Sequence, residues 1–498
     1  MANRSAALYA VVSLLGAGGG GGCGFGQSGI EPPVDRIFLP AGLAADPGGQ
    51  WLYAVNSNSD LRFNAGTVVA VDVHKADADY QRRSGPASAW PVCPSPGYLP
   101  DENGTGTCCW DFFDNLVLNC DDRMYVDPKS TVRIGSFGGN ALIEPRTDLP
   151  AGSSGRLYVA VRSEPSVTFM DLTPSATGVQ LKCDSTGSAG AFCDEAHKIR
   201  GDANNSALSA LRLVEEPHAM ALDPQSFGPP DNNPGLGLLY VGHLIEGLSM
   251  ISTCDPAKPE LLSVNRRIFY GQNGFGVTSV MLPHPGDPKA PVIVTGRNYN
   301  YFGPGEVQNL TLRGIDGVCK QGGPTNRAGA EAVESTGFYS SAFYSEGSDI
   351  RSMVTLGTHA YLLHRNATVR QNPPSVVEID QSLDANGKPF NRAVGLVETC
   401  AGATEMLLHD AGRGPRLYVV CFEAGQIYVI DPTPLSVVGV INVGRGPTTL
   451  AFSPDKQSSR GYVLGFSDNN ISVVDLDTTS PTENRVIQRI GFPQLRKR

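Results

Sequence analysis

A short pattern in the last part of the chain repeats at a fixed interval. A Leu-Tyr-Val run around Tyr418 returns as Tyr-Val-Leu at Tyr462, and these tyrosines are 44 residues apart. The aspartates that end the next apolar run, Asp431 and Asp475, are also 44 residues apart. An interval of about 40 to 50 residues between short apolar runs is typical of β-propeller blades. The repeat therefore predicts the fold class before any function is considered.

Related apolar runs along the chain predict an all-β, seven-bladed β-propeller with four antiparallel strands in each blade. The expected second strands of the blades are residues 51–55, 156–160, 238–241, 292–294, 360–363, 416–420 and 461–464. The expected third strands are residues 67–72, 166–171, 248–251, 306–310, 375–380, 426–431 and 470–475. An inner strand precedes each pair, often with an Asp-Pro or Pro-Asp turn, which favours a sharp reversal of the chain.

These motifs resemble a known family. Leu52-Tyr-Ala-Val-Asn56, Leu157-Tyr-Val-Ala-Val161 and Leu417-Tyr-Val-Val420 are similar to the motifs of YVTN-type seven-bladed propellers of bacterial surface proteins. The inner-strand unit 446–455 adds to the likeness. The resemblance covers residues 35–492 and is weakest in the fourth and fifth blades. It implies a single propeller in the bacterial cell envelope.

The charge balance excludes a nucleic-acid partner. The chain has 39 Lys and Arg against 49 Asp and Glu, a formal net charge of −10, whereas nucleic-acid binding requires a basic face. The sequence also lacks a P-loop, a Gly-x-Ser-x-Gly elbow, a His-Glu-x-x-His motif and a covalent haem motif. No cofactor is therefore expected.

The N-terminal residues predict export. Residues 1–23 combine Arg4, an apolar stretch and small residues, which is typical of a signal peptide. The segment ends at Cys23 after a glycine run, and it resembles a bacterial lipoprotein signal in which this cysteine is lipidated. An ordinary signal peptide followed by a glycine linker is the alternative. Residues 24–34 are expected to form a flexible linker and residues 493–498 a basic tail.

The cysteines also indicate that the protein is exported. Eleven are present, and without Cys23 an even number remains. They lie in local groups, which in an exported chain predicts disulfides. We expect bridges between Cys183 and Cys193, between Cys254 and Cys319 and between Cys400 and Cys421, whereas the pairing within residues 93–120 stays open. The candidates are Cys93, Cys108, Cys109, Cys120, Cys183, Cys193, Cys254, Cys319, Cys400 and Cys421.

Three long insertions are expected after the third strands of the first, second and fourth blades, at residues 74–130, 173–208 and 313–337. Because strands alternate in direction, these insertions should emerge on one face of the propeller. The loops that carry polar residues should emerge on the opposite face.

A set of polar residues is predicted near that opposite face. His243 and His364 occupy the same blade position, three residues after the tyrosine, and Asn56 holds it in the first blade. The other candidates, expected near the same rim, are His218, Arg162, Arg297 and Glu405. Such a funnel could bind a carboxylate or a metal, or polarise a lactone carbonyl. The alternative is that the opening of the propeller is filled with solvent and lined with polar side chains that bind no specific ligand. We predict no specific metal site.

Two functions follow from this pattern. The first is an exported, lipid-anchored binding or scaffold module of the periplasm, outer membrane or cell surface, with a protein or small-molecule partner. Its only membrane contact would be the lipid anchor. The second is an enzyme centred on the funnel, such as a lactonase-like hydrolase, because a related propeller family has this activity.

Overall fold

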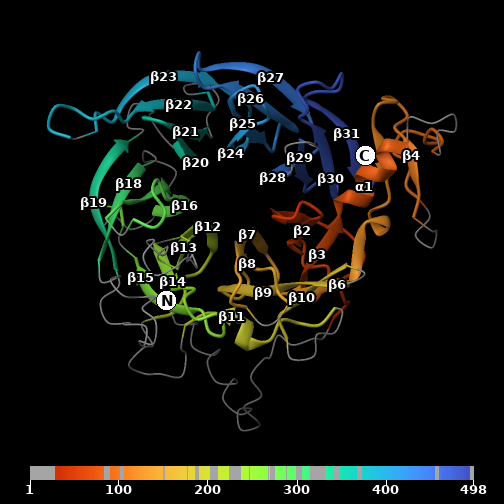
Figure 1. The fold of residues 1–498 in the computed structure, drawn as a ribbon, viewed down its shortest axis with the longest axis horizontal. Coiled ribbons are helices and arrows are strands. Elements are labelled where there is room, and N and C mark those ends of the chain that lie inside the picture. Colours follow the sequence, from red (N-terminus) through yellow and green to blue (C-terminus); the bar gives the residue numbers. More distant parts are fainter. Residues whose placement is uncertain are drawn as a thin grey trace, which may run out of the picture.

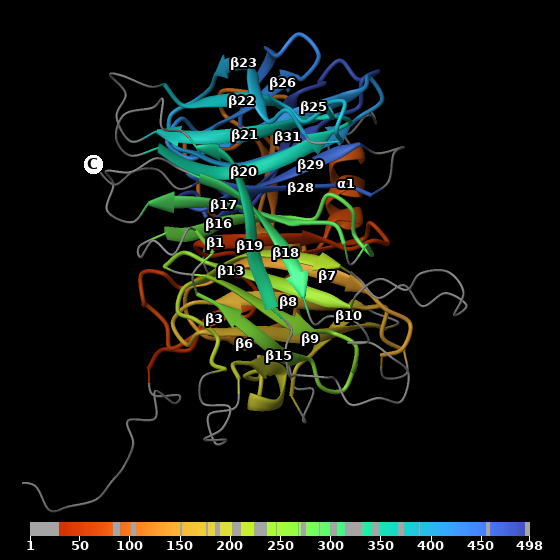
Figure 2. The same ribbon diagram turned by 90° about the vertical axis from the view of Figure 1, so that its left-hand side faces the viewer.

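The computed structural model describes residues 29–82, 90–100, 106–149, 152–175, 178–184, 190–201, 211–223, 237–245, 247–266, 268–269, 275–287, 289–298, 306–313, 331–340, 348–366, 373–387, 389–454 and 459–493. These residues form a β-propeller arrangement of small sheets around a common axis (Figure 1). Figure 2 presents the same arrangement edge-on. Cys23, the lipidation candidate, lies outside the described residues.

Five sheets form separate blades. The first contains β1 (Pro40–Ala45), β2 (Trp51–Asn56), β3 (Gly66–Asp72) and β6 (Val126–Ile134). The second contains β7 (Gly138–Pro145), β8 (Gly155–Val161), β9 (Ser166–Ser175), β10 (Gly178–Lys182) and β11 (Lys198–Ile199). The third contains β12 (Pro217–Asp223), β13 (Leu238–His243), β14 (Leu248–Ser252) and β15 (Glu260–Asn265).

Two further separate blades lie near the C-terminus. One contains β24 (Ala403–Asp410), β25 (Pro415–Cys421), β26 (Gln426–Asp431) and β27 (Ser436–Asn442). The last sheet contains β28 (Pro447–Phe452), β29 (Arg460–Gly465), β30 (Asn470–Asp475) and β31 (Arg485–Ile490), and it is extended by β5 (Leu118–Cys120) and β4 (Cys108–Trp110). Within the described residues, every predicted second and third strand coincides with a strand of the structure.

The segments predicted as the fourth and fifth blades lie in one eight-stranded sheet. It contains β16 (Phe275–Met281), β17 (Val292–Asn298), β18 (Glu306–Arg313), β19 (Glu331–Ser340), β20 (Ser348–Leu356), β21 (His359–Asn366), β22 (Ser375–Asp380) and β23 (Arg392–Glu398). The two halves are joined because β17 pairs with β20 at Arg297 and Asp349. The prediction of seven separate blades is therefore wrong: five separate blades are found.

The inner strands form a closed ring around the axis. Each of β1, β7, β12, β16, β20 and β24 contacts the next one, and β28 contacts both β24 and β1. The tyrosines of the repeated motif lie in the core, and each is at most 3 % exposed: Tyr53, Tyr158, Tyr240, Tyr361, Tyr418 and Tyr462. Tyr53 belongs to a cluster that also contains Val159 of the second sheet, and Tyr462 to one that contains Leu52 of the first sheet. Burial of such large side chains between sheets holds the ring together.

Four disulfides join described cysteines: Cys93–Cys109, Cys108–Cys120, Cys183–Cys193 and Cys400–Cys421. The predicted Cys183–Cys193 and Cys400–Cys421 bridges are thus present. Cys254 is also disulfide-bonded, and its predicted partner Cys319 lies outside the described residues. No helix among the described residues is long and apolar enough to cross a membrane.

The disulfide-bonded insertions cover the outer edges of neighbouring sheets. The 173–208 insertion covers β6, since the Arg133 amide donates to the Ala191 carbonyl oxygen (2.8 Å) and the Cys193 amide donates to that of Arg133 (3.0 Å). Such cover protects an edge from pairing with another chain. Much of the 313–337 insertion lies outside the described residues, and β19 begins within it at Glu331.

The first insertion joins the two ends of the ring. It carries α1 (Val73–Gln81), the 3₁₀ turn Asp122–Met124 and the clasp, which we define as residues 108–120 with β4, β5 and the Cys108–Cys120 bridge. Strand β5 pairs in parallel with β31 of the last sheet. The Gln488 side-chain amide also donates to the Ala76 carbonyl oxygen (3.1 Å). Figure 1 places α1 and β4 beside β30 and β31, although they are far apart in sequence.

Removal of the clasp bridge should loosen ring closure. The Cys108→Ala/Cys120→Ala variant is expected to lose about 2–4 kcal/mol of unfolding free energy and to lose hydrogen-exchange protection at the β31 amides. Chemical denaturation and hydrogen exchange would measure these two effects.

A matched control is the Cys183→Ala/Cys193→Ala variant. Its loop spans 10 residues against 12 for the clasp bridge, so the two chain-entropy effects are similar. It should lose protection at β6 and keep it at β31. Unchanged protection of β31 in the clasp variant would contradict the role of this bridge in closure.

Candidate functional site

A cavity of about 480 Å³ lies at the axis, where the inner strands begin. This volume is in the range of small-molecule sites. Its lining comes from all the sheets: Ala41, Ser57, Ser59, Phe137, Gly138, Gly139, Asn140, Arg162, His218, Ala219, Met220, Thr278, Ser279, Val280, Arg351, Ser352, Thr404, Glu405, Thr448, Thr449 and Phe466.

A β-bulge in each inner strand supplies much of this lining. In every inner strand the pairing register shifts near the start, for example between Pro217 and Ala219 in β12 and between Ile350 and Ser352 in β20. A bulge places an extra residue in one strand and re-aims its side chain. The residues skipped by the register are Ala41, Gly139, Asn140, His218, Thr278, Arg351, Thr404, Thr448 and Thr449, and all of them line the cavity.

His218 lies in a positive environment within this cavity. Burial lowers the pKa of its imidazole, and the nearby guanidinium groups of Arg351, Arg162 and Arg297 lower it further, to about 3. A desolvated ring loses the hydration that stabilises its charged form, and cations oppose protonation. The ring is therefore neutral at ordinary pH.

The arginines around His218 are held by acidic partners. Arg162 forms an ion pair and a hydrogen bond with Glu216, and Arg351 lies 2.6 Å from Asp349. Burial lowers the pKa of Arg351; Asp349 raises it, whereas neighbouring Arg365 and Arg297 lower it. Burial is the largest cause of the lowered pKa of both His218 and Arg351, and neighbouring guanidinium groups lower both pKa values further.

Glu405 comes from β24 and lies on another side of the cavity. Burial raises the pKa of its carboxyl group, although Thr449 and the Leu450 amide donate hydrogen bonds to it. The cavity thus holds a carboxyl group that accepts a proton more readily than usual, together with several hydroxyl groups. This side of the cavity is therefore polar, and Glu405 can exchange a proton with a bound molecule.

The structure places only some of the predicted residues in this cavity. Arg162, His218 and Glu405 line it together, and Arg297 lies close enough to lower the pKa of His218. Arg351 was not predicted. Arg351 occupies the bulge position of β20, directly after Ile350, and His218 occupies the same position of β12, directly after Pro217. Comparison of the inner strands with one another could therefore have identified Arg351.

His243, His364 and Asn56 lie elsewhere, each with 0 % exposure. The Asn56 side-chain amide donates to Thr67 Oγ1 (2.8 Å), and its oxygen accepts from the Phe38 amide (3.0 Å). His243 Nδ1 donates to the Glu215 carbonyl oxygen (3.2 Å), so Nε2 of the neutral ring accepts from the Ser249 hydroxyl (2.8 Å). The prediction that they line the funnel needs correction: the third residue after the tyrosine still belongs to the strand and its side chain is internal.

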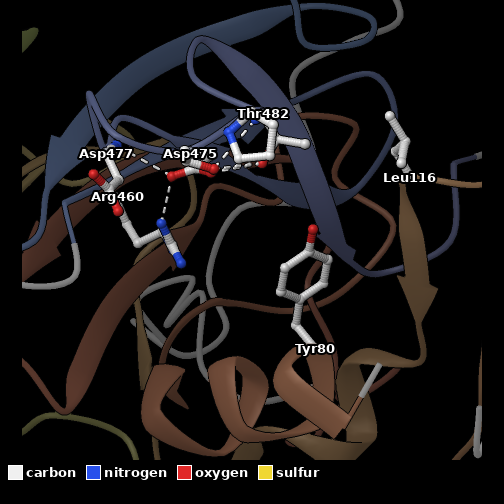
Figure 3. A pocket seen from close by; sticks show the side chains of 8 residues that line it. Tyr80, Leu116, Arg460, Asp475, Asp477 and Thr482 are labelled. Carbon is white, nitrogen blue, oxygen red and sulfur yellow. Dashed lines mark hydrogen bonds and ion pairs between the residues drawn. The ribbon is translucent and has the colours of Figure 1, made fainter. Parts of the chain in front are cut away.

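The described residues contain no group of three or more His, Cys, Asp or Glu side chains that could hold a metal ion. A second cavity, of about 360 Å³, lies at the seam between the last sheet and the first insertion. Figure 3 shows Tyr80 pointing from α1 toward the strand and loop that carry Asp475 and Thr482. Asp475 already binds Arg460 (2.6 Å) and Thr482 (2.7 Å). These contacts join strands and loops at the seam and indicate a structural role.

No protein-family model matches the sequence, and no curated protein matches it. Among solved structures, the chain is similar to hydrazine synthase from Kuenenia stuttgartiensis, with 13% identity over 92% of this chain and 99% of the other and a TM-score of 0.48. It is also similar to a candidate 6-phosphogluconolactonase from Bacteroides uniformis, with 12% identity over 82% and 87% and a TM-score of 0.44. A protein from Lactobacillus plantarum shares 12% identity over 73% and 89% with a TM-score of 0.45. These likenesses are too distant to assign a function.

The internal histidines should make stability depend on pH. Burial lowers the pKa of His243 and of His364 to about 4, whereas an unfolded histidine titrates near 6.5. Between these values the unfolded state binds more protons, so stability falls as the pH drops from about 6.5 to about 4, by up to about 3 kcal/mol for each ring.

The His243→Asn/His364→Asn variant should flatten this dependence, because Asn56 fills the same position in the first sheet without titrating. Urea unfolding at a series of pH values would measure the slope. Exposed His284 offers the control, since His284→Asn should leave the slope unchanged. An equally steep slope in the double variant would show that other groups cause the dependence.

Proposed function

We propose that this chain is an exported, lipid-anchored β-propeller of the bacterial cell envelope that binds a small anionic molecule in its central cavity. The observation that carries the proposal is that Arg162, Arg351 and His218 line one cavity, with Arg297 close enough to lower the pKa of His218. An anion placed beside these groups would offset their mutual repulsion and form charge-assisted hydrogen bonds.

The cavity favours a small ligand over a macromolecule. Its lining residues come from inner strands and adjoining loops, and they enclose about 480 Å³. Neutral His218 offers one donor and one acceptor. The hydroxyl groups of Thr278, Thr404 and Thr449 already donate within the protein. A small carboxylate or phosphate would therefore use the arginines for charge and His218 for orientation.

Export and anchoring are supported by two observations. The disulfides of the insertions are typical of proteins that fold in an oxidising compartment. The N-terminal segment ending at Cys23 resembles a lipoprotein signal, and the repeat motifs resemble YVTN-type surface propellers. A scaffold role, in which the stapled insertions bind a partner protein, is compatible with this placement and is not needed for the ligand proposal.

The lactonase-like hydrolase remains a prediction from the sequence. One feature favours it, namely the raised pKa of Glu405, which lines the same cavity as His218, because a carboxyl group of this kind can transfer protons. This function would be established if the wild type hydrolyses δ-valerolactone and the Glu405→Gln variant does not. Absence of turnover would leave the binding function.

Anion binding should depend on Arg351. We expect acetate and inorganic phosphate to bind the wild type at one site and to shift the ring resonances of His218. The Arg351→Gln variant should bind at least about tenfold more weakly, because a hydrogen bond to a charged group contributes about 1.5–3 kcal/mol. Calorimetry and histidine NMR would measure these effects.

Arg416→Gln is the matched control. It removes the same charge from an ion pair with Asp431 (3.1 Å) that lies outside the cavity lining. It should keep wild-type affinity. Equal affinities in wild type and Arg351→Gln, or no saturable binding of either anion, would contradict the proposed site.

The lipid anchor should depend on Cys23. Expressed in a bacterial host with a lipoprotein pathway, the wild type should sediment with membranes and carry added lipid mass. The Cys23→Ala variant should lose both properties. Fractionation and mass measurement check this, and an unchanged membrane fraction in the variant would refute the anchor.

A further inference from the structure

The residue before each inner strand has an unusual backbone conformation. It has a positive φ at all five positions where the structure describes it: Leu39 (41°), Phe137 (57°), Glu216 (57°), Gly402 (70°) and Gly446 (63°). Residues with a Cβ rarely adopt this left-handed region, because the Cβ clashes with the backbone. Glycine, as found before β24 and β28, is the residue that fits without strain.

The same hydrogen bond fixes this conformation each time. The carbonyl oxygen of the left-handed residue accepts from the amide of the first residue after the second strand of its sheet. The distances are 3.1 Å from Ser57 to Leu39, 3.3 Å from Arg162 to Phe137, 3.0 Å from Leu244 to Glu216, 3.0 Å from Phe422 to Gly402 and 2.9 Å from Phe466 to Gly446. The fold therefore sets the backbone here, whatever the side chain.

Two of the three strained side chains belong to the cavity. Phe137 lines it directly, and Glu216 holds Arg162, which lines it. Leu39 does not belong to the lining. Because strained residues persist where the side chain has a use, Phe137 and Glu216 are the ones to consider for ligand recognition.

The cavity lining combines ionisable and aromatic side chains. Arg162, Arg351 and Glu405 are ionisable, and His218 is a neutral imidazole. Phe137 and Phe466 supply the two phenyl rings of the lining, which also contains polar residues such as Ser57 and Thr448. The Arg162 amide donates to the Phe137 carbonyl oxygen (3.3 Å), so a guanidinium group and a phenyl ring come from neighbouring backbone positions.

We propose that the ligand is a carboxylate attached to a ring or another flat apolar group, and that Phe137 sets this preference. The carboxylate lies toward Arg162, His218 and Arg351, and the ring lies against Phe137, whose backbone is hydrogen-bonded to that of Arg162. This inference rests on the proposed anion site and adds the chemical class of its ligand. Aromatic rings favour contact with flat apolar groups, and Phe137 lines the cavity beside a cationic residue.

Acetate carries only the carboxylate of the proposed ligand, whereas benzoate carries the carboxylate and a phenyl ring. A comparison of the two affinities therefore measures the contribution of the ring. Wild type should bind benzoate about tenfold or more tightly than acetate, because burial of a phenyl ring adds to the binding of the shared carboxylate. Phe137→Gly should reduce this ratio to within about threefold and leave acetate affinity unchanged. The variant should fold, because glycine holds the equivalent position at Gly402 and Gly446.

Leu39→Gly is the control, since it makes the same backbone change outside the lining. It should keep the wild-type preference for benzoate. Acetate binding with no preference for benzoate, or a preference that survives in Phe137→Gly, would overturn the ring contact and leave the anion site standing. Failure of both ligands to bind the wild type would overturn the anion site as well.

Discussion

The parallel pairing of β5 with β31 joins the insertion of the first sheet to the last sheet, and together with the contact between β1 and β28 it closes the ring around the central cavity. A ring of sheets has two ends that must meet, and here a segment stapled by Cys108–Cys120 holds them together. The Leu39 amide adds to this closure by donating to Asn469 Oδ1 at 2.6 Å. Because the cavity takes residues from every sheet, an open ring would separate the groups around His218. Closure at the outer rim and the site at the axis are therefore linked.

The backbone of the inner strands repeats, and the side chains it presents do not. Each inner strand has a bulge near its start, and each described residue before it has a positive φ. At the bulge the residue is alanine in the first sheet, histidine in the third and arginine in the eight-stranded sheet. A common scaffold thus presents a different group from each sheet to one cavity, as expected for function placed on a repeat fold.

The sequence predicted the parts of the fold that have strong local patterns. The Leu-Tyr-Val runs located the buried second strands, because a short, continuous apolar run with β-branched residues leaves a clear pattern. The pairing of β17 with β20 left no such pattern, so the eight-stranded sheet was not expected. Among cysteines, neighbouring strands indicated Cys400–Cys421, whereas loop positions left Cys93–Cys109 and Cys108–Cys120 open. Bridges within loops follow the folded path of the chain, which spacing alone does not give.

The candidate site was predicted less well, for a physical reason. Arg162, His218 and Glu405 were identified, but the shared position of His243, His364 and Asn56 reflected a structural role inside the sheets. A repeated position is more often required by the repeat than by a ligand. Arg351 was missed because bulges shift the side-chain alternation by one residue, and a bulge is not visible in a simple apolar pattern.

The central claim is that the groups around His218 attract an anion into the axial cavity. The most direct measurement is anomalous diffraction from a crystal soaked in bromide, which is an anion with an unambiguous signal. A bromide ion within contact distance of Arg351 and His218 is expected. Bromide ions bound only on the outer surface, with none in a solvent-accessible axial cavity, would contradict the claim.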